Sequence, residues 1–226
     1  KRRGCADTRG TMFFEICRII GAKRPEYIVL ENVKGLLNHE KGRTFSTIIV
    51  SLQELGYDVE WVLLNSKFHG VPQNRERVFI VAHLGERGRS KILPFGKNDK
   101  TANEPYKKTI NNIDANYYKG IDNHGQRTII RVNPGKQPQS GVIYSTQGIA
   151  PTLSANGGGL GAKTGLYKLT KDEVRRLTPI ECERLQGFPD GYTSGHSDTQ
   201  RYKMLGNAVT VNVVKYLFDT LETRLI

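Results

Sequence analysis

The sequence has little of several features that mark particular classes of protein. Its 226 residues include three cysteines, two methionines and one tryptophan, and 37% are hydrophobic, below the roughly 45–50% of an average globular chain. Three widely spaced cysteines form neither a disulfide framework nor a zinc-ligand pattern, and the five histidines show no ligand spacing. Apolar runs such as 78–84 are far shorter than the roughly 18 residues of a membrane span. We therefore expect a cytoplasmic globular protein without a metal or a membrane partner.

Negative charge is also scarce. The chain has 34 Lys and Arg against 22 Asp and Glu, a formal net charge of +12. This excess favours a polyanionic partner, although a solvated basic face has the same composition. No acidic residue lies between Asp122 and Asp172. The basic residues there include Arg127, Arg131, Lys136, Lys163 and Lys168. The acid-free stretch is thus a candidate phosphate-contacting surface.

Hydrophobic periodicity predicts an α/β domain in the first part of the chain. Apolar residues at helical spacing predict helices over 11–20 and 45–55, the second ended by Gly56. Buried strands are predicted at 27–30, 59–64 and 78–82. The order helix, strand, helix, strand, strand is typical of an open α/β sheet. Ligands bind at the carboxyl ends of strands in such sheets, so the residues after Leu30 and Leu64 are the first candidates for a site.

Beyond Leu84 the sequence predicts a loop-rich second domain. Ten of the 24 glycines lie between Gly120 and Gly165, with only short strand-like runs such as 128–132. Helices are expected to resume at Thr170 and Thr178, because a capping-box sequence begins at each. The last helix is expected to begin near Thr210.

Polar residues gather at the predicted strand ends. Glu31 follows the first strand, and the run 70–77 leads into the third. Arg75 and Arg77 are two residues apart, so on a strand they would point to the same side, toward a phosphate or a polar ring. Taken one at a time, these residues fit an ordinary loop carboxylate and salt-bridged surface arginines equally well.

Two glycine-containing segments have the features of ligand loops. Residues 157–164 resemble a phosphate loop, but Ala162 stands where glycine is required and no helix follows, which argues against an ATPase. A flexible segment whose backbone approaches DNA closely is the alternative. Near the end, residues 206–209 are small and precede a helix, whose first backbone N–H groups are open to a ligand unless the helix is simply capped.

Seven motifs follow one another along the chain, at residues 7–15, 31–33, 70–77, 143–159, 176–182, 187–189 and 206–209. Their order and spacing resemble the later motifs of the cytosine-5 DNA methyltransferases, and the resemblance covers nearly the whole chain. It implies an α/β fold: the C-terminal part of a Rossmann-like catalytic sheet that uses S-adenosylmethionine, with a smaller, loop-rich, β-containing target-recognition domain. The implied boundaries are 1–84 for the later half of the catalytic domain, 85–203 for target recognition and 204–226 for a segment and helix that pack on the catalytic domain.

The resemblance implies methyl transfer from S-adenosylmethionine to carbon 5 of a cytosine flipped out of the duplex. Glu31 matches the carboxyl that holds ring nitrogen 3 and the exocyclic amine, and Arg77 matches the arginine that reaches the base carbonyl. Arg75 and Gln73 match supporting positions of the pocket. The segment that folds against the cofactor corresponds to Asn207, Ala208 and Val209.

Double-stranded DNA is the implied partner. The candidate DNA contacts are Arg9, Gln139, Thr152, Asn156, Gly157, Gly158, Gly159 and Lys163. Gln139 aligns with a glutamine that fills the space left by the flipped base, whereas Thr152 and the glycines match positions that grip the surrounding backbone. Val142 stands where a compact bacterial member has an arginine that reads guanine. The target sequence of that member therefore does not carry over.

Three family motifs do not occur in this sequence: the Phe-x-Gly-x-Gly cofactor loop, the acidic residue for the cofactor ribose and the Pro-Cys-Gln nucleophile loop. Residues 1–4 match the stretch just after Pro-Cys-Gln, so the nucleophilic cysteine is expected upstream. We expect the C-terminal part of a bacterial or phage restriction-modification methylase, inactive alone and monomeric when complete. Its missing partner is the N-terminal half, in the same chain or as a separate subunit.

Two alternatives remain open at this point, a subunit of a split methyltransferase and a non-catalytic DNA-binding relative. The presence of Glu31 together with Arg75 and Arg77 favours an enzyme. A module that only binds DNA has no use for a carboxylate beside a flipped base.

Overall fold

The structure is a computed structural model that describes residues 8–85, 142–146, 148–155, 163–169 and 174–225, with only the backbone described at 8–11 and 223–225. The chain forms two compact units. The described part of the first unit comprises residues 8–64, 76–85 and 223–225, and that of the second comprises 65–75 and the described residues from 142 to 222.

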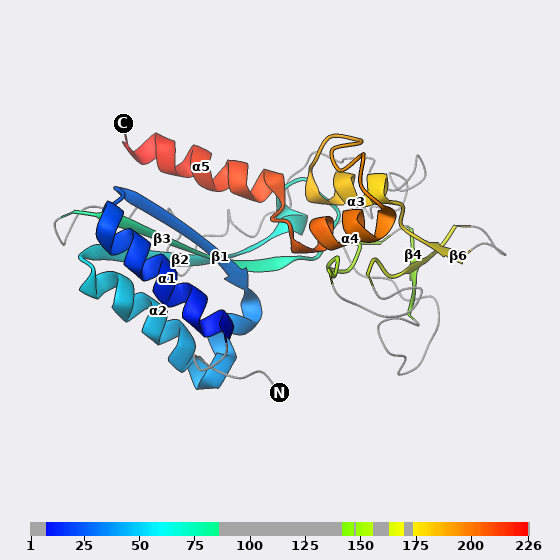
Figure 1. Cartoon of the computed structure of the whole chain (residues 1–226). Helices are drawn as coiled ribbons and strands as arrows, with labels where there is room; N and C mark the ends of the chain where they lie inside the picture. Colours follow the sequence, from blue (N-terminus) through cyan, green and yellow to red (C-terminus); the bar gives the residue numbers. More distant parts are fainter. Residues whose placement is uncertain (1–7, 86–141, 147, 156–162, 170–173, 226) are drawn as a thin grey trace. The chain divides into compact units, whose positions relative to one another are not determined.

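The first unit is a three-stranded sheet with two α-helices (Figure 1). Its elements are α1 (Thr8–Lys23), β1 (Tyr27–Val33), the 3₁₀ segment η1 (Lys34–Gly42), α2 (Arg43–Glu54), β2 (Tyr57–Asn65) and β3 (Glu76–Leu84), with strand order β1-β3-β2. Every element predicted for this region is present, and most are longer than predicted, whereas α2 ends one residue before its predicted limit. Gly56 follows α2 with a φ of 88°, the left-handed conformation expected of a helix-ending glycine.

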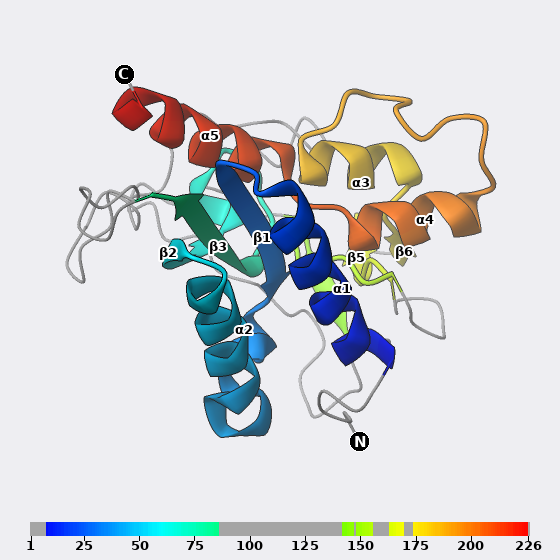
Figure 2. The same cartoon turned by 60° about the vertical axis from the view of Figure 1, so that its left-hand side comes forward.

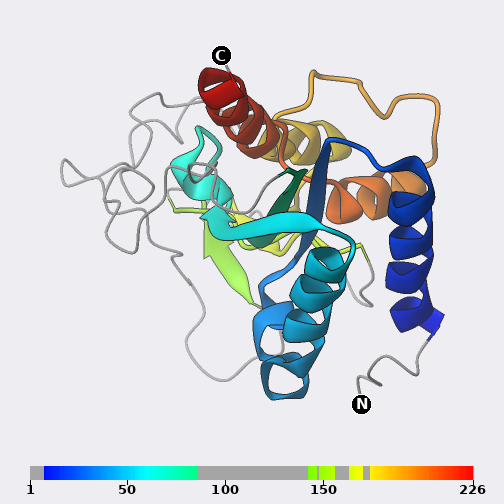
Figure 3. The same ribbon diagram turned by 90° about the vertical axis from the view of Figure 1, so that its left-hand side faces the viewer.

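Helices α1 and α2 are neighbours that cover one face of this sheet (Figure 3). The shared hydrophobic cluster includes Ile20 of α1, Leu52 of α2, Ile28 of β1 and, from β3, Val78 and Ile80. Because side chains alternate along a strand, the intervening residues of β1 and β3 project from the opposite face. That second face carries Glu31 and Arg77.

Strands β1 and β3 pair antiparallel, from Tyr27 opposite His83 to Val33 opposite Arg77. The carboxyl end of β1 therefore meets the amino end of β3. Sequence periodicity identified both strands but contained no information about this direction, which brings Glu31 near Arg77 although they are far apart in sequence.

The second unit joins a small sheet to three helices (Figure 2). Its elements are the 3₁₀ turn η2 (Ser66–Phe68), β4 (Ile143–Ser145), β5 (Leu166–Lys168), β6 (Val174–Arg176), α3 (Pro179–Gln186), α4 (Asp198–Asn207) and α5 (Val211–Leu225). Strand β4 is parallel to β5, and β5 is antiparallel to β6. Tyr144, Tyr167, Leu185 and Leu205 belong to one buried cluster that connects sheet and helices. None of the helices in the described ranges is long and apolar enough to cross a bilayer.

The prediction of a helix that begins at Thr170 is wrong for the residues that the structure describes. Residues 170–173 lie outside the described residues, but 174–176 form β6, which pairs with β5. Backbone pairing with a neighbouring strand overrides a local capping signal. The second capping box is confirmed, since the Glu181 amide donates to Thr178 Oγ1 at 3.3 Å and the Thr178 amide donates to the Glu181 carboxylate at 2.7 Å.

Helix α4 was not predicted because most of its side chains are polar, and among them only Tyr202 and Leu205 supply large buried apolar groups. Helix α5 was predicted and begins at Val211. The boundaries of the two units differ from those of the predicted domains. Residues 65–75 and 204–222, predicted to belong with the catalytic domain, group with the second unit. The functional domain boundaries stay a prediction.

A fully buried carboxylate anchors the loop between α3 and α4. Glu183, 0% exposed, accepts hydrogen bonds from the Gly191 amide at 2.7 Å, the Thr193 amide at 2.9 Å and the Thr193 hydroxyl, and pairs with Arg201 at 3.0 Å. Burial by itself would raise the pKa of Glu183, but the bonds from Thr193, Arg201 and Gly191 outweigh it and lower that pKa. The loop conformation therefore depends on this ionised group.

Glu183→Gln should destabilise the protein by about 2–4 kcal/mol, because it removes the charge opposite the half-buried Arg201 guanidinium. The midpoint of urea unfolding would measure the loss. The control is Asp190→Asn, which removes a carboxylate from an exposed pair with Arg184 and should leave the midpoint nearly unchanged. Equal midpoints for both variants would contradict the anchoring role.

His69 has a buried imidazole ring, and its Nε2 atom has no hydrogen-bond partner among the described residues. Its ring lies 4.7 Å from the ring of Tyr216. Burial lowers the pKa of His69 to about 4. The folded protein thus holds His69 neutral at a pH where an unfolded chain would already protonate it.

Folding stability should consequently fall as the pH drops from about 6.5 toward about 4, since the unfolded state binds the extra proton first. The contribution of His69 between pH 7 and pH 5 is about 2 kcal/mol. His69→Phe keeps a ring against Tyr216 and should remove this part of the pH dependence in urea unfolding. His196→Gln, at an exposed position, should retain it, and a His69→Phe protein with the unchanged pH profile would contradict the assignment.

Candidate active site and nucleic-acid interface

The first unit pairs a carboxylate with a guanidinium on the sheet face opposite α1 and α2. Arg77 Nε lies 2.9 Å from Glu31 Oε1, and the side chains are 14% and 30% exposed. The register explains the contact: Glu31 lies opposite Phe79 and Arg77 opposite Val33, so the two form a diagonal pair on one face. Sequence analysis placed both residues at strand ends but did not predict their direct contact.

The Arg77 guanidinium feels two opposing influences. Burial lowers the pKa of Arg77, and the neighbouring Glu31 opposes that shift. A guanidinium remains protonated at neutral pH in either case. The Glu31 side chain remains 30% exposed beside this cation. The pair therefore presents an accessible anionic acceptor beside a cation, which suits a planar polar ring bearing N–H donors and a carbonyl.

The second unit is organised around a buried arginine. Arg75 is 2% exposed and donates to three backbone carbonyls: Leu153 at 3.2 Å, Gly206 at 3.1 Å and Ala208 at 2.6 Å. The sequence predicted that Arg75 and Arg77 point to the same side of one strand. Arg75 instead lies just before β3, and its side chain binds residues of the second unit. Its guanidinium binds backbone rather than standing open to a ligand.

Gln73 and Thr152 hold two segments of the second unit side by side. The buried Gln73 donates to the Leu185 carbonyl at 3.2 Å and forms an isolated parallel bridge with Ala150. Thr152 Oγ1 donates to the Asn74 carbonyl at 2.6 Å. The hydroxyl expected to grip DNA thus makes an internal bond, which leaves its predicted DNA contact untested.

The predicted cofactor segment runs from the last residue of α4 into the turn that precedes α5. Asn207 is exposed, whereas Ala208 and Val209 are half-buried. The chain after this segment is held by a group of polar contacts among Thr210, Gln186 and Ser66, whose contacts sequence analysis did not predict. Thr210 Oγ1 donates to Gln186 Oε1 at 2.8 Å and lies 2.8 Å from Ser66 Oγ. Gln186 in turn donates to the Leu205 carbonyl at 2.7 Å. No local motif marks such a chain of contacts, because its members are distant in sequence.

Several predicted DNA contacts cannot be placed. Gln139, Asn156, Gly157, Gly158 and Gly159 lie outside the described residues, and Arg9 lies in the backbone-only part of α1. Lys163 is described, with Nζ 5.9 Å from the centre of the Tyr202 ring. Val142 is buried in the hydrophobic cluster of the second unit.

The two described cysteines are poor nucleophiles. Cys17 and Cys182 lie in α1 and α3 as predicted, and burial raises the pKa of both thiols. Within the described ranges, no group of three or more His, Cys, Asp or Glu side chains could hold a metal ion.

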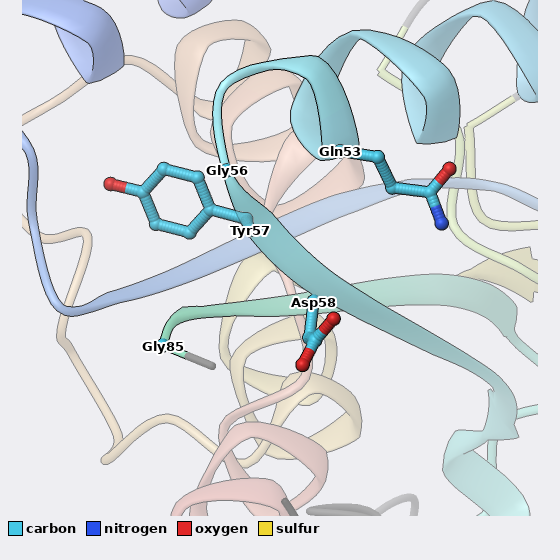
Figure 4. Close-up of a pocket in the computed structure, with 5 residues that line it drawn as sticks. All are labelled: Gln53, Gly56, Tyr57, Asp58 and Gly85. Atoms are coloured by element: carbon cyan, nitrogen blue, oxygen red, sulfur yellow. The ribbon is translucent and has the colours of Figure 1, made fainter. Parts of the chain in front are cut away.

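A pocket of about 590 Å³ lies elsewhere in the first unit. It is lined by Gln53, Gly56, Tyr57, Asp58 and Gly85. Figure 4 shows the three larger side chains pointing in different directions rather than toward a common point. Gly85 follows the last residue of β3, the opposite end from Arg77, so this pocket is separate from the Glu31–Arg77 pair.

The described residues thus combine helices and small sheets with a carboxylate–guanidinium pair on two neighbouring strands. The sequence model for the C-5 cytosine-specific DNA methylases matches residues 1–223, and the chain belongs to that family. The described mixture of helices and strands confirms the predicted α/β class.

Curated relatives include three type II methyltransferases. M.HhaI of Haemophilus parahaemolyticus is 34% identical over 96% of this chain, M.SsoII of Shigella sonnei 37% over 99%, and M1.ScrFI of Lactococcus lactis subsp. cremoris 38% over 95%. The chain spans 69%, 60% and 56% of these relatives, respectively. A substantial part of each of these relatives therefore has no counterpart in this chain.

Solved structures share the fold at lower identity. S. pombe Dnmt2 methyltransferase has a TM-score of 0.68 and 20% identity, covering 100% of this chain and 75% of that chain. The Entamoeba histolytica methyltransferase EhMeth has a TM-score of 0.66 and 20% identity, covering 97% and 70%. The arrangement of helices and strands is thus one found in methyltransferases.

Arg75→Lys should destabilise the second unit by about 2–4 kcal/mol, because one ammonium group cannot span three separated carbonyls and leaves buried acceptors unsatisfied. Urea unfolding would measure this loss. Arg77→Lys is the control, since lysine can still pair with Glu31 as a point charge, and its loss should be smaller. A larger loss for Arg77→Lys than for Arg75→Lys would contradict the role of Arg75.

Proposed function

We propose that this chain is the later part of a DNA (cytosine-5)-methyltransferase that modifies a specific duplex sequence within a restriction-modification system. The observation that carries the proposal is the ion pair between Glu31 and Arg77, partly exposed on one sheet face. Family membership supports the same reaction.

Each group of the pair has a role that follows from its charge. The carboxylate of Glu31 accepts hydrogen bonds from the exocyclic amine and the protonated ring nitrogen 3 of a flipped cytosine. Arg77 donates to the base carbonyl and holds Glu31 in place. Both contacts stabilise the ring when a cysteine thiolate adds to carbon 6 and carbon 5 takes the methyl group, which leaves S-adenosylhomocysteine. Loss of the carbon 5 proton then breaks the bond between carbon 6 and sulfur and releases the thiolate.

S-adenosylmethionine is the proposed methyl donor. The exposed Asn207 and the half-buried Ala208 and Val209 would contact it. These residues fit such a role because Arg75 binds the Gly206 and Ala208 carbonyls and so holds the turn in one conformation. The bound cofactor supplies an electrophilic methyl group, and this segment positions it.

We also propose that the Rossmann-like sheet, the cofactor loop and the nucleophilic cysteine are completed by polypeptide outside this sequence. The partial coverage of the relatives supports this, as do the raised pKa values of Cys17 and Cys182. In this proposal residues 1–84 and 204–226 serve catalysis and 85–203 target recognition. The completed enzyme acts on double-stranded DNA as a monomer in the cytoplasm.

Glu31→Gln, introduced into the complete gene product, should reduce methyl transfer to cytosine about 100-fold or more, since the neutral amide cannot stabilise the protonated ring. Transfer of radiolabelled methyl groups to duplex DNA would measure the rate, and gel shift would measure binding, which should change little. Glu76→Gln is the matched control, because Glu76 pairs with Lys34 in the same unit. Full activity in Glu31→Gln would contradict the assignment.

A further inference from the structure

Two cations of the second unit converge on one buried tyrosine. The Arg176 guanidinium carbon lies 5.0 Å from the centre of the Tyr202 ring, and Lys163 Nζ lies 5.9 Å from the same centre. Arg176 ends β6, Tyr202 lies within α4, and Lys163 precedes β5. Three separate segments thus place two positive charges around a single aromatic ring.

The ring itself is fixed. Tyr202 is 5% exposed, and its hydroxyl donates to the Leu177 carbonyl at 2.7 Å. An aromatic face attracts a cation through its quadrupole and restrains long side chains that would otherwise move freely. Arg176 nevertheless remains exposed and Lys163 half-buried. The two charges are therefore held in position while still accessible to solvent.

Neither cation is neutralised within the described residues, where no carboxylate pairs with Arg176 or Lys163. The adjacent Arg175 differs, since its two terminal nitrogens each lie 2.8 Å from an oxygen of the Glu181 carboxylate. Consecutive arginines on one strand thus have opposite functions. Arg175 stabilises the start of α3, whereas Arg176 keeps its charge available.

The sheet register adds a third cation to the same face. Arg176 lies opposite Leu166, and Val174 lies opposite Lys168. Because directly opposed residues share a face, as do residues two apart on a strand, Lys168 and Arg176 project from the same side. We define Lys163, Lys168 and Arg176 as the β5–β6 basic cluster.

We propose that the β5–β6 basic cluster binds backbone phosphates of duplex DNA, with Arg176 and Lys163 as principal contacts and the Tyr202 ring as their positioning group. The assignment rests on the proposed methyltransferase function, which requires a duplex partner. A guanidinium and an ammonium without paired carboxylates suit phosphate oxygens, and such contacts are independent of base sequence.

The test is the salt dependence of binding between the full chain and a fluorescein-labelled duplex, followed by anisotropy. Each lost phosphate contact should reduce the magnitude of the slope of log K, the logarithm of the association constant, against log salt concentration by about 0.9. The same loss weakens binding roughly eightfold at 0.1 M salt. Arg176→Gln and Lys163→Gln should each show this change, and the double variant about twice the change in slope. Arg176→Lys should retain most of the slope.

Arg175→Gln is the matched control. It also removes one positive charge, from the adjacent position, but that charge is already paired with Glu181. Its slope should equal that of the unsubstituted chain. Equal slopes for Arg176→Gln and Arg175→Gln would overturn the inference, as would tighter binding to an acidic peptide than to DNA. Thermal melting of each variant would confirm that the fold is retained.

The two proposals can fail separately. An unchanged slope in Arg176→Gln, with methyl transfer abolished by Glu31→Gln, would reject the phosphate cluster and leave the enzymatic proposal standing. A reduced slope in Arg176→Gln with full activity in Glu31→Gln would do the reverse. Failure of the unsubstituted chain to bind duplex DNA at low salt would contradict the phosphate cluster.

Discussion

The buried guanidinium of Arg75 is the interaction on which the second unit depends most. A planar group with five donors can satisfy carbonyls from several chain segments at once, and Arg75 does so for Leu153, Gly206 and Ala208. The close approach that it stabilises leaves no room for a side chain at Gly206, where an added Cβ would lie 2.6 Å from the Ala155 Cα. The conformation of the turn after α4 follows from these contacts.

The first unit achieves its geometry differently, through strand register. Antiparallel pairing of β1 with β3 sets Glu31 and Arg77 diagonally across from each other on the face not covered by α1 and α2. A shift of either strand by one residue would turn its own charged side chain toward the hydrophobic cluster, where unscreened charge is costly. The burial of Ile28 and Val78 on one face therefore fixes the position of the ion pair on the other. Packing and chemistry share the same register.

Charged side chains in this protein divide into those used internally and those left available. Glu183 with Arg201 and Glu181 with Arg175 stabilise loops and helix ends, and their charges are compensated. Arg176 and Lys163 have no such partners among the described residues and lie near an aromatic ring instead. The formal charge of +12 therefore measures an excess, whereas the local pairing indicates which cations are available to a polyanion.

The sequence by itself determined the family, the strands and helices of the first unit, the capped start of α3 and the residue types of the Glu31–Arg77 pair. These features are local or depend on motif order, so periodicity and capping chemistry suffice. Tertiary structure alone decided that 174–176 are a strand, that the polar segment 198–207 is a helix and that Arg75 binds carbonyls while Arg77 binds a carboxylate. Each of these outcomes depends on partners distant in sequence, whose contacts outweigh local propensity.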